Sequence, residues 1–314
     1  MRRIAAVFGG SGFIGRQVVK RLAAQDYIVR IVTRDAEAVQ PQMTQGRVGQ
    51  IVPVLANISD DASVGRAVAG CDVVINLLGI LFERRAGDFT RVQAEAPGRI
   101  ARAASAAGVS HLVHISAIGA DAGSDSLYAR TKAEGEAAVR QGFPAAVILR
   151  PSVVFGPEDS FFNRFAGLAR MLPFMPVVHG ETKFQPVYVG DVADAVMAAI
   201  ARPDAAGRVF ELGGPRVASF RDLMGFVLTT TRRRKRMIDL PMGLVRFQAR
   251  IGDRLPKPPL TTDQLKLLER DNVVAEGADG LAALGIAPTP MEAVVPGYLS
   301  RFRRGGDRRD TSPA

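Results

Sequence analysis

The feature that most constrains the fold is a glycine-rich segment close to the start of the chain. Glycines recur at Gly9, Gly12 and Gly15, directly after the apolar run Ile4–Phe8 and directly before the amphipathic stretch Phe13–Ala24. A strand that turns through such glycines into a helix is typical of a dinucleotide site. The first glycine permits the tight turn, the second lets the pyrophosphate approach the backbone, and the third lets helix and strand pack closely. The helix N-terminus then offers its amide N–H groups to the phosphates. The residues expected to contact the pyrophosphate are Gly9, Gly10, Ser11, Gly12, Phe13, Ile14 and Gly15.

Beyond this loop, short apolar runs alternate with amphipathic stretches through the first half of the chain. The runs expected to form strands are 4–8, 28–33, 50–54, 73–76, 111–115 and 146–150, and the expected helices are 13–24, 63–68, 89–107 and 125–141. This alternation predicts an α/β fold, a Rossmann-type doubly wound parallel sheet with helices on both faces. We therefore expect a dinucleotide-binding domain over residues 1–150.

The pattern changes after Pro151. Shorter elements, and a proline-rich stretch at 172–176 that cannot continue a helix, predict a smaller C-terminal α+β domain over residues 151–303. Some of its segments are expected to return to the sheet. The expected helices are 161–171, a helix to residue 202 with Asp191 as its N-cap, 220–231, 244–255, 262–270 and 291–303, and the expected strands are 185–189, 209–212 and 235–240. Residues 304–314 predict a basic flexible tail.

Residues at the ends of the other strands indicate which cofactor the loop would hold. Arg34 follows the second strand, where an NAD site typically carries an acid for the ribose hydroxyls. An arginine there can pair with a 2′-phosphate, which favours NADPH. The alternative is an ordinary surface arginine, since Asp35 follows directly. Because ligands lie at the carboxyl ends of parallel strands, the same rule extends to the later strands. The further contacts expected are Asn57 and Ile58 at the adenine, and Leu77, Leu78, Gly79 and Pro151 along the cofactor.

Tyr128 and Lys132 form a Y-x-x-x-K pattern on an expected helix. The i, i+4 spacing places the phenol and the ammonium on one face of that helix. An ammonium beside a phenol makes the phenol a usable acid or base, and the lysine can also hold the nicotinamide ribose. With the glycine-rich loop upstream, the chain resembles the short-chain dehydrogenase/reductase superfamily, specifically its extended and atypical members.

That resemblance implies a catalytic hydroxyl just after the fifth strand, where extended members usually carry paired serines and use the second. Ser116 matches the first position, and Ala117 occupies the second. The alanine removes a hydrogen-bond donor to a substrate carbonyl, and Ser116 would replace it only in a different register. The resemblance therefore implies cofactor binding and leaves hydride transfer open. Tyr128 and Lys132 would then hold the cofactor without turning over a substrate.

A closer resemblance extends over nearly the whole chain. Its motifs are Leu149-Arg150-Pro151-Ser152 with the residues to Asp159, then 161–165, 185–192, 74–79 and 284–290. On these the chain resembles the nucleotide-binding accessory subunit of respiratory complex I, the alpha-subcomplex subunit nine family. The family is a non-core subunit that holds NADPH far from the electron path, on the peripheral arm near its junction with the membrane arm and the quinone site. The alternative is a free-standing NADPH-dependent reductase or sugar-nucleotide-type epimerase that uses Tyr128 and Lys132.

The net charge of +10 is concentrated in two segments. Residues 232–257 carry +7 and residues 301–314 carry +3, so the rest of the chain is neutral. In a helix over 244–255, Leu244, Phe247 and Ile251 share one face and the arginines another. Such a helix beside a basic run can lie on an anionic lipid surface or dock on a partner subunit, or it can simply cap the small domain. The residues assigned to this surface are Arg232, Arg233, Arg234, Lys235, Arg236, Arg246, Arg250 and Arg254.

Several classes of protein are excluded by composition. One cysteine and three scattered histidines argue against a disulfide framework and against a metal site. With no Trp and no aromatic residue among 232–236, the basic run lacks the stacking partners of a nucleic-acid surface. No apolar run approaches the ~20 residues that span a bilayer, and no targeting leader precedes the first strand. Combined with the resemblance to the complex I subunit, the missing leader implies a peripheral protein on the cytoplasmic face of a bacterial inner membrane.

Overall fold

The computed structural model describes residues 2–253, 255 and 260–305, which belong to two compact units. The first unit, here called the sheet unit, contains the chain up to Pro151 together with Val189–Leu212 and Val274–Ala287. The second unit contains Ser152–Tyr188, Gly213–Val273 and the residues from Pro288 onward. The chain thus leaves the sheet unit after the sixth strand of the sheet and returns to it twice. Each unit is described by itself.

The sheet unit is built on a seven-stranded sheet in which every pairing is parallel. Its strands are β1 (Ile4–Phe8), β2 (Ile28–Thr33), β3 (Ile51–Leu55), β4 (Val73–Asn76), β5 (His111–Ile115), β6 (Val147–Pro151) and β11 (Val209–Leu212). The order β11-β6-β5-β4-β1-β2-β3 contains the Rossmann order, whose direction reverses between β1 and β4. The expected α/β fold with a doubly wound parallel sheet is confirmed. The six strands expected in the first half of the chain agree with the observed ones to within a residue.

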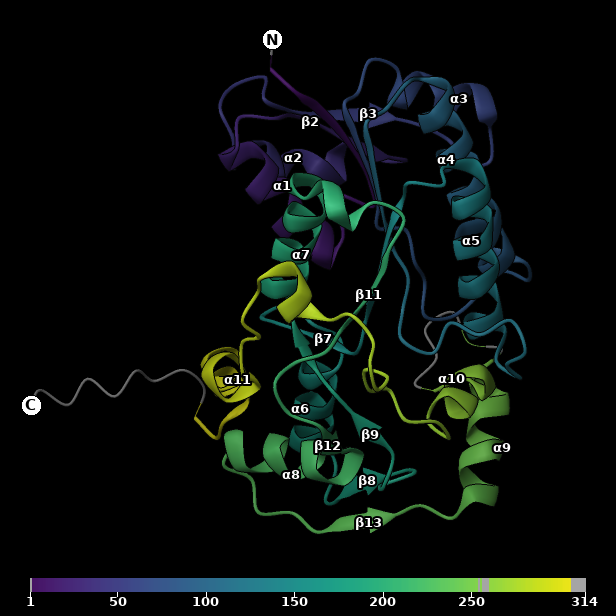
Figure 1. The fold of residues 1–314 in the computed structure, drawn as a ribbon. Helices are drawn as coiled ribbons and strands as arrows, with labels where there is room; N and C mark the ends of the chain where they lie inside the picture. Colours follow the sequence, from purple (N-terminus) through teal and green to yellow (C-terminus); the bar gives the residue numbers. More distant parts are fainter. Residues whose placement is uncertain (1, 254, 256–259, 306–314) are drawn as a thin grey trace, which may run out of the picture. The chain divides into compact units, whose positions relative to one another are not determined.

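Helices cover both faces of this sheet (Figure 1). On one face lie α1 (Phe13–Ala24) and α7 (Val189–Ala201), and on the other lie α3 (Asp61–Val68), α4 (Ala96–Ala106) and α5 (Leu127–Gly142). Short helical segments complete the unit: η1 (Glu37–Val39), α2 (Gln40–Met43), η3 (Pro203–Ala205) and η4 (Leu281–Leu284). The core beneath α3, α4 and α5 is made of small and β-branched residues such as Val64, Val74 and Ala101, each fully buried.

Two helices of the sheet unit are among the elements that differ from expectation. The helix expected at 89–107 begins with a π-helical turn, η2 (Thr90–Glu95), before α4. There the backbone meets α5 so closely that a Cβ on Gly135 would lie 2.0 Å from the carbonyl oxygen of Gln93. The helix expected to start after Asp191 begins at Val189, directly after strand β10 (Val187–Tyr188), so the expectation of Asp191 as N-cap is wrong. Asp191 lies instead in the first turn, where its negative charge interacts favourably with the positive end of the helix dipole.

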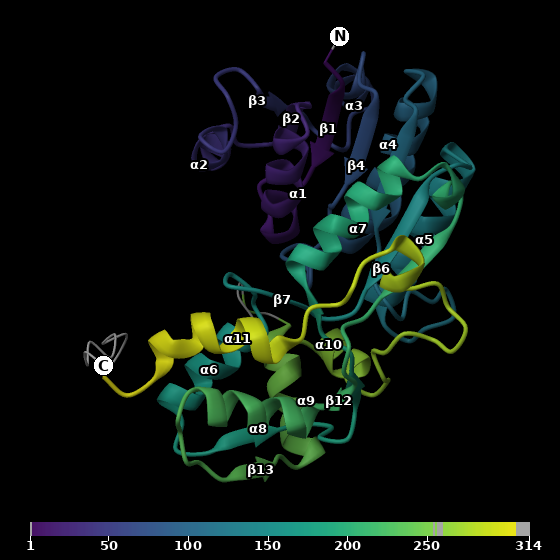
Figure 2. The ribbon, with the colours of Figure 1, turned by 60° about the vertical axis from the view of Figure 1, so that its left-hand side comes forward.

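The second unit combines three two-stranded pairings with a helical layer. Its strands are β7 (Val154–Phe155) with β10, β8 (Met175–Val177) with β13 (Met237–Asp239), and β9 (Lys183–Phe184) with β12 (Ala218–Ser219). Its helices are α6 (Phe162–Met171), α8 (Phe220–Thr230), α9 (Met242–Gly252), α10 (Thr262–Leu267), α11 (Met291–Leu299) and η5 (Ser300–Phe302). Figure 2 shows α6, α8 and α11 side by side. The core of this unit is rich in phenylalanine. Helices α9 and α10 end three residues before their expected limits, and α11 ends four residues before its expected limit. Within the described ranges no helix is long and apolar enough to cross a membrane.

Candidate dinucleotide site

The glycine-rich loop is shaped by close approaches of its own backbone. Gly9 has φ of +77°, a left-handed conformation that glycine adopts without strain. The amide of Gly12 donates to the carbonyl of Gly9 at 3.0 Å and closes the turn. A Cβ on Gly15 would lie 2.4 Å from the carbonyl oxygen of Gly9 and 2.6 Å from that of Gly10, so only glycine fits where α1 packs on the loop. Gly9 and Gly15 therefore need glycine for local geometric reasons.

Helix α1 presents an open N-terminus to this loop. Gly12 is its N-cap and supplies no side chain, and the first turn contains no acidic residue. The first amides of a helix have no partner inside the helix, and they carry the positive end of its dipole. Here those amides belong to Phe13, Ile14 and Gly15. This end of the helix is accordingly suited to an anionic group such as a pyrophosphate.

At the end of β2, Arg34 differs from its neighbours Thr33 and Asp35 in its hydrogen bonds. The carboxylate of Asp35 accepts a hydrogen bond at 2.9 Å from the amide of Glu37, the first residue of η1. Thr33 holds the same turn, since its hydroxyl donates to the Asp35 carbonyl at 2.9 Å and accepts from the Asp35 amide at 3.1 Å. Arg34 is exposed and has no hydrogen bond or ion pair within the described part of the chain. The arginine is therefore the side chain left to bind an anion, and Asp35 is occupied locally.

The chain after β3 and β4 turns along the same carboxyl edge of the sheet. Asn57 is exposed, and its side-chain oxygen accepts from the amide of Ser59 at 3.0 Å, while Ile58 is half-buried. After β4, the Leu77 amide continues the ladder by donating to the Phe8 carbonyl at 2.9 Å. The Leu78 amide donates to the side-chain oxygen of Asn76 at 3.1 Å. The segment 77–79 is thereby held against the end of β1, and a Cβ on Gly9 would lie 3.1 Å from the Leu77 carbonyl.

Helix α5 carries Tyr128 and Lys132. Tyr128 is half-buried, with its ring in edge-to-face contact with Phe89 at 5.9 Å between centroids. Lys132 is buried, and its Nζ donates to the carbonyl of Ile115 at 3.3 Å. The same Nζ would lie 3.4 Å from a Cβ on Gly79, so the structure brings α5 and the end of β4 together. Burial lowers the pKa of Lys132 to about 8, against the smaller opposing effect of Glu136.

The polar groups around the end of β5 are buried. The hydroxyl of Ser116 has no hydrogen-bond partner among the described residues. His114 shares a 3.1 Å hydrogen bond between its Nδ1 and the side-chain nitrogen of Asn76. Because an amide nitrogen can only donate, Nδ1 accepts, and the neutral ring then carries its proton on Nε2. Burial, helped by the nearby charge of Lys132, lowers the pKa of His114 to about 3. Ala117 is half-buried beside this pair of strands and offers no hydroxyl.

The sequence analysis did not identify the buried carboxylate whose charge acts on Lys132. Glu136, one turn along α5, is buried and holds Arg150 through two hydrogen bonds of 2.8 and 2.7 Å. Arg150 also reaches Glu211 on β11 at 3.4 Å, and Glu211 accepts from the Ala275 amide at 2.9 Å. The i, i+4 spacing of Lys132 and Glu136 was a signal in the sequence that could have found this network. Pro151, the next residue, is buried, and its carbonyl accepts from the Ile118 amide at 3.1 Å.

The basic residues of the second unit separate into two groups. Arg233 donates to the Phe302 carbonyl at 2.8 Å, and Lys235 donates to the Leu172 carbonyl, so both brace the unit from within. The exposed members of the predicted surface are Arg232, Arg234, Arg236, Arg246 and Arg250. Arg254 lies outside the described residues. Within the described residues, no group of three or more His, Cys, Asp or Glu side chains is arranged to hold a metal ion.

The fold and the loop define a dinucleotide-binding protein, and comparison with known proteins gives its family. A model of the NAD dependent epimerase/dehydratase family matches residues 5–213, so the chain belongs to that family. The UDP-glucose 4-epimerase of Thermus thermophilus, solved with NAD, has the same fold at a TM-score of 0.69 and 21% identity, over 96% of this chain and 99% of that one.

Two relatives narrow the assignment. NADH dehydrogenase [ubiquinone] 1 alpha subcomplex subunit 9 of Mus musculus is 35% identical over 99% of this chain and 84% of that protein. Its counterpart from Arabidopsis thaliana is 32% identical over 96% of this chain and 79% of that protein. With this identity over nearly the whole length, the chain is a member of the alpha subcomplex subunit 9 family within the larger epimerase/dehydratase family.

Proposed function

We propose that this chain is a non-core accessory subunit of a bacterial proton-pumping NADH:ubiquinone oxidoreductase, complex I. It holds NADPH as a structural ligand and stabilises the peripheral arm near the membrane and quinone junction, on the cytoplasmic face of the inner membrane. The observation that carries the proposal is the similarity to subunit 9 proteins over almost the entire chain, second unit included. A free-standing dehydrogenase has no need of that second unit's particular sequence.

The residues of the sheet unit fit NADPH. The open N-terminus of α1 suits the pyrophosphate, and Arg34, which has no partner in the described chain, suits the 2′-phosphate. Tyr128 and Lys132 suit the nicotinamide ribose, and the unpartnered Ser116 hydroxyl provides a buried polar group at the same strand end. When bound, NADPH supplies a transferable hydride. Ala117, however, leaves the site without the second hydroxyl that would orient a substrate carbonyl.

A ligand can be kept without turnover because binding alone stabilises the folded state. The gain is RT ln(1 + [L]/Kd), about 4 kcal/mol at a thousandfold excess over Kd. That is a large part of the stability of an ordinary domain. NADPH would thus lock the sheet unit in its folded form while leaving electron transfer to the core subunits.

The outward face of α9 supports a place at the membrane. Val245, Ala249 and Gly252 are the residues of this helix that are buried. Its apolar side chains on the other side remain exposed: Leu244 by 48%, Phe247 by 62%, Ile251 by 47%, and Leu255, just beyond the helix, by 44%. Arg246 and Arg250 are exposed on the same helix. An apolar stripe flanked by arginines favours an anionic lipid surface, and each basic residue near such a surface contributes about 1 kcal/mol.

Complex membership is tested on a native gel of membranes solubilised in mild detergent, stained for NADH dehydrogenase activity and probed for this chain. Comigration with the large active band is the expected result. A band near the mass of the free chain, released from membranes by salt alone, would contradict stable membership.

The choice of cofactor is tested by titrating the purified protein with NADPH and NADH. We expect NADPH to bind more tightly, and Arg34→Ala to abolish the preference while retaining NADH binding. Arg66→Ala, which removes another exposed arginine of the sheet unit, is the matched control. Equal dissociation constants in the unaltered protein would refute the role of Arg34.

The lipid surface is tested by flotation with vesicles of phosphatidylglycerol or phosphatidylcholine. We expect salt-sensitive binding to the anionic vesicles, weakened by Phe247→Asp and by charge reversal of Arg232, Arg234 and Arg236 together. Val48→Asp, which alters a fully exposed apolar residue of the sheet unit, is the control. Binding unchanged in both altered proteins would show that these residues face a protein partner or solvent.

The alternative function is a free-standing NADPH-dependent reductase or epimerase. The observation in its favour is that Tyr128 and Lys132 are retained on one helix, with the pKa of Lys132 lowered towards neutrality. Ala117→Ser distinguishes the two functions. Restoring the hydroxyl should raise NADPH oxidation in a screen of carbonyl substrates if the chain is an enzyme, and should change nothing if it is a scaffold.

A further inference from the structure

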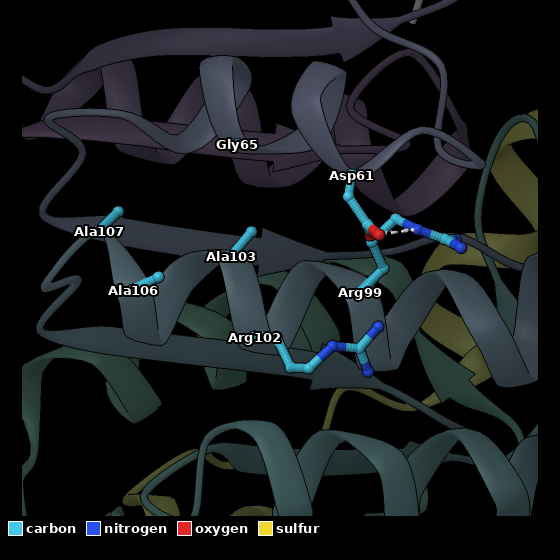
Figure 3. Close-up of a pocket in the computed structure, with 7 residues that line it drawn as sticks. All are labelled: Asp61, Gly65, Arg99, Arg102, Ala103, Ala106 and Ala107. Carbon is cyan, nitrogen blue, oxygen red and sulfur yellow. Dashed lines mark hydrogen bonds and ion pairs between the residues drawn. The ribbon is translucent and has the colours of Figure 1, made fainter.

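One arginine outside the predicted site reaches across to a loop of that site. Arg99 lies on α4, and its Nη1 donates to the carbonyl oxygen of Ile58 at 2.8 Å. Its Nε donates to the carboxylate of Asp61, in the first turn of α3, at 2.6 Å. Figure 3 shows this pair, with the guanidinium of Arg99 meeting the carboxylate of Asp61. Two donors of a single rigid guanidinium thus hold two points of the segment 58–61.

The other hydrogen bonds of this segment are local. The Asn57 amide donates to the hydroxyl of Ser63, six residues further on, at 3.0 Å, and the Ser59 amide donates to the Asn57 side chain at 3.0 Å. The Asp60 amide donates to the Asn57 carbonyl at 3.1 Å. Among the described residues, Arg99 is therefore the side chain that fixes the segment to a different helix by hydrogen bonds.

We propose that Arg99 is a positioning residue for the adenine half of the dinucleotide, because it fixes the Ile58 carbonyl at the carboxyl edge of the sheet. The proposal rests on the dinucleotide site proposed above. Asn57 and Ile58 follow β3, at the edge where the adenine of a dinucleotide binds in this topology. Because the Arg99 guanidinium holds the Ile58 carbonyl, the Ile58 side chain keeps one orientation. The dinucleotide therefore does not have to order this loop when it binds.

A purely stabilising role explains this arrangement less well. The side chain of Asp61 is 77% exposed, and an ion pair to so exposed a carboxylate contributes little to folding. The Arg99 side chain is only 17% exposed, its bond to the Ile58 carbonyl is charge-assisted and therefore stronger than a neutral one, and its planar guanidinium fixes the direction of both donors. The geometry favours orientation of the loop over the stability of the unit.

The helix offers its own control residue. Arg102 is three positions further on α4 and lines the same surface hollow of about 440 Å³, together with Gly65 and three alanines. It is exposed and has no hydrogen bond or ion pair anywhere in the described ranges. Arg99 and Arg102 therefore carry the same charge, lie on the same helix and line the same hollow. They differ in that Arg99 alone of the two binds the Ile58 carbonyl.

The experiment compares Arg99→Ala, Arg102→Ala and Asp61→Asn in the full chain by calorimetric titration with NADPH and NADH. Arg99→Ala should weaken both cofactors by the same factor, about tenfold, so that the NADPH/NADH ratio stays that of the unaltered protein. Arg102→Ala should bind as the unaltered protein does. Asp61→Asn keeps the bond to Ile58 and should also bind nearly normally. Amide hydrogen exchange at residues 58–61 should accelerate in Arg99→Ala alone.

Other outcomes overturn the proposal in distinguishable ways. Unaltered affinity in Arg99→Ala refutes it directly, as does a loss of affinity matched by an equal loss in Arg102→Ala. If Arg99→Ala lowers the melting temperature of the cofactor-free protein, Arg99→Lys is measured, which keeps one donor for the Ile58 carbonyl. Full loss of affinity in this folded variant would then also refute the proposal. If the unaltered protein binds neither cofactor, the dinucleotide site itself is wrong, and the proposal falls with it.

Discussion

Replacing Gly15 by alanine tests whether the glycine-rich loop needs the close approach of α1 to keep its shape and bind a dinucleotide. The added Cβ would lie 2.4 Å from the carbonyl oxygen of Gly9 and 2.6 Å from that of Gly10, and both contacts are to backbone. No side chain can rotate away, so the loop or α1 must move. Overpacking of this kind costs about 1–3 kcal/mol. Alanine in a helix returns about 0.5–1 kcal/mol relative to glycine, which leaves a net destabilisation of up to about 2.5 kcal/mol.

The control is Gly65→Ala on α3, in the same unit, where a Cβ meets nothing within 4 Å. Here the helix preference of alanine acts alone, and we expect a gain of about 0.5–1 kcal/mol. Thermal melting of the two proteins without ligand should therefore shift in opposite directions. Titration with NADPH should show weaker binding in Gly15→Ala, because the displaced carbonyls belong to the loop, and unchanged binding in Gly65→Ala. A Gly15→Ala protein that melts at or above the unaltered protein and binds NADPH equally well would refute the reasoning.

Three further predictions concern buried charges. The pKa of Lys132 is about 8 instead of 10.5. Between pH 8 and 10.5 the unfolded chain therefore holds a proton that the folded chain has released. The free energy of unfolding should accordingly rise with pH through this window. Melting curves across this range should show the rise in the unaltered protein and not in Lys132→Met, which should also melt higher at pH 7. The pKa of His114 is about 3 instead of 6.5, so stability should fall as pH drops from 6.5 towards 3, and His114→Leu should flatten this part of an acid titration followed by circular dichroism. Glu136→Gln breaks the buried pair with Arg150 and should cost about 3 kcal/mol in denaturant unfolding, whereas Asp204→Asn, in an exposed pair, should change nothing measurable.

The sheet unit was predictable because its elements are long enough to carry a pattern. Strands of four to six residues between glycine, asparagine and aspartate stand out from the helices around them, and the loop at Gly9 fixes the chain's direction between the first two elements. The second unit has strands of only two or three residues, such as β7, β9 and β12. Two residues have no period, so these pairings depend on contacts between distant segments that no local pattern records.

The candidate site was predictable at the level of positions and not of contacts. The strand ends that carry Arg34, Asn57 and Gly79 follow from topology alone. The hydrogen bond from the Glu37 amide to the Asp35 carboxylate, by contrast, depends on the 3₁₀ turn that follows Asp35. The hold of Arg99 on the Ile58 carbonyl joins residues 41 positions apart. The sequence indicates which side chains can bind a ligand. The folded structure determines which of them already form hydrogen bonds within the protein.

The same distinction applies to charge and apolar surface in the second unit. Summed along the sequence, residues 232–236 are five equal cations, yet Arg233 and Lys235 are committed to backbone carbonyls within the unit. Helix α9 shows the complementary case, since its largest apolar side chain, Phe247, faces outward while Ala249 and Gly252 face the protein. A helix that only capped a domain would bury its large apolar residues and expose its small ones, because burial of a large side chain contributes the most. Val245 is buried on the inner face of α9, but the larger Leu244, Phe247 and Ile251 remain exposed. This arrangement supports the lipid contact proposed above for the outer face.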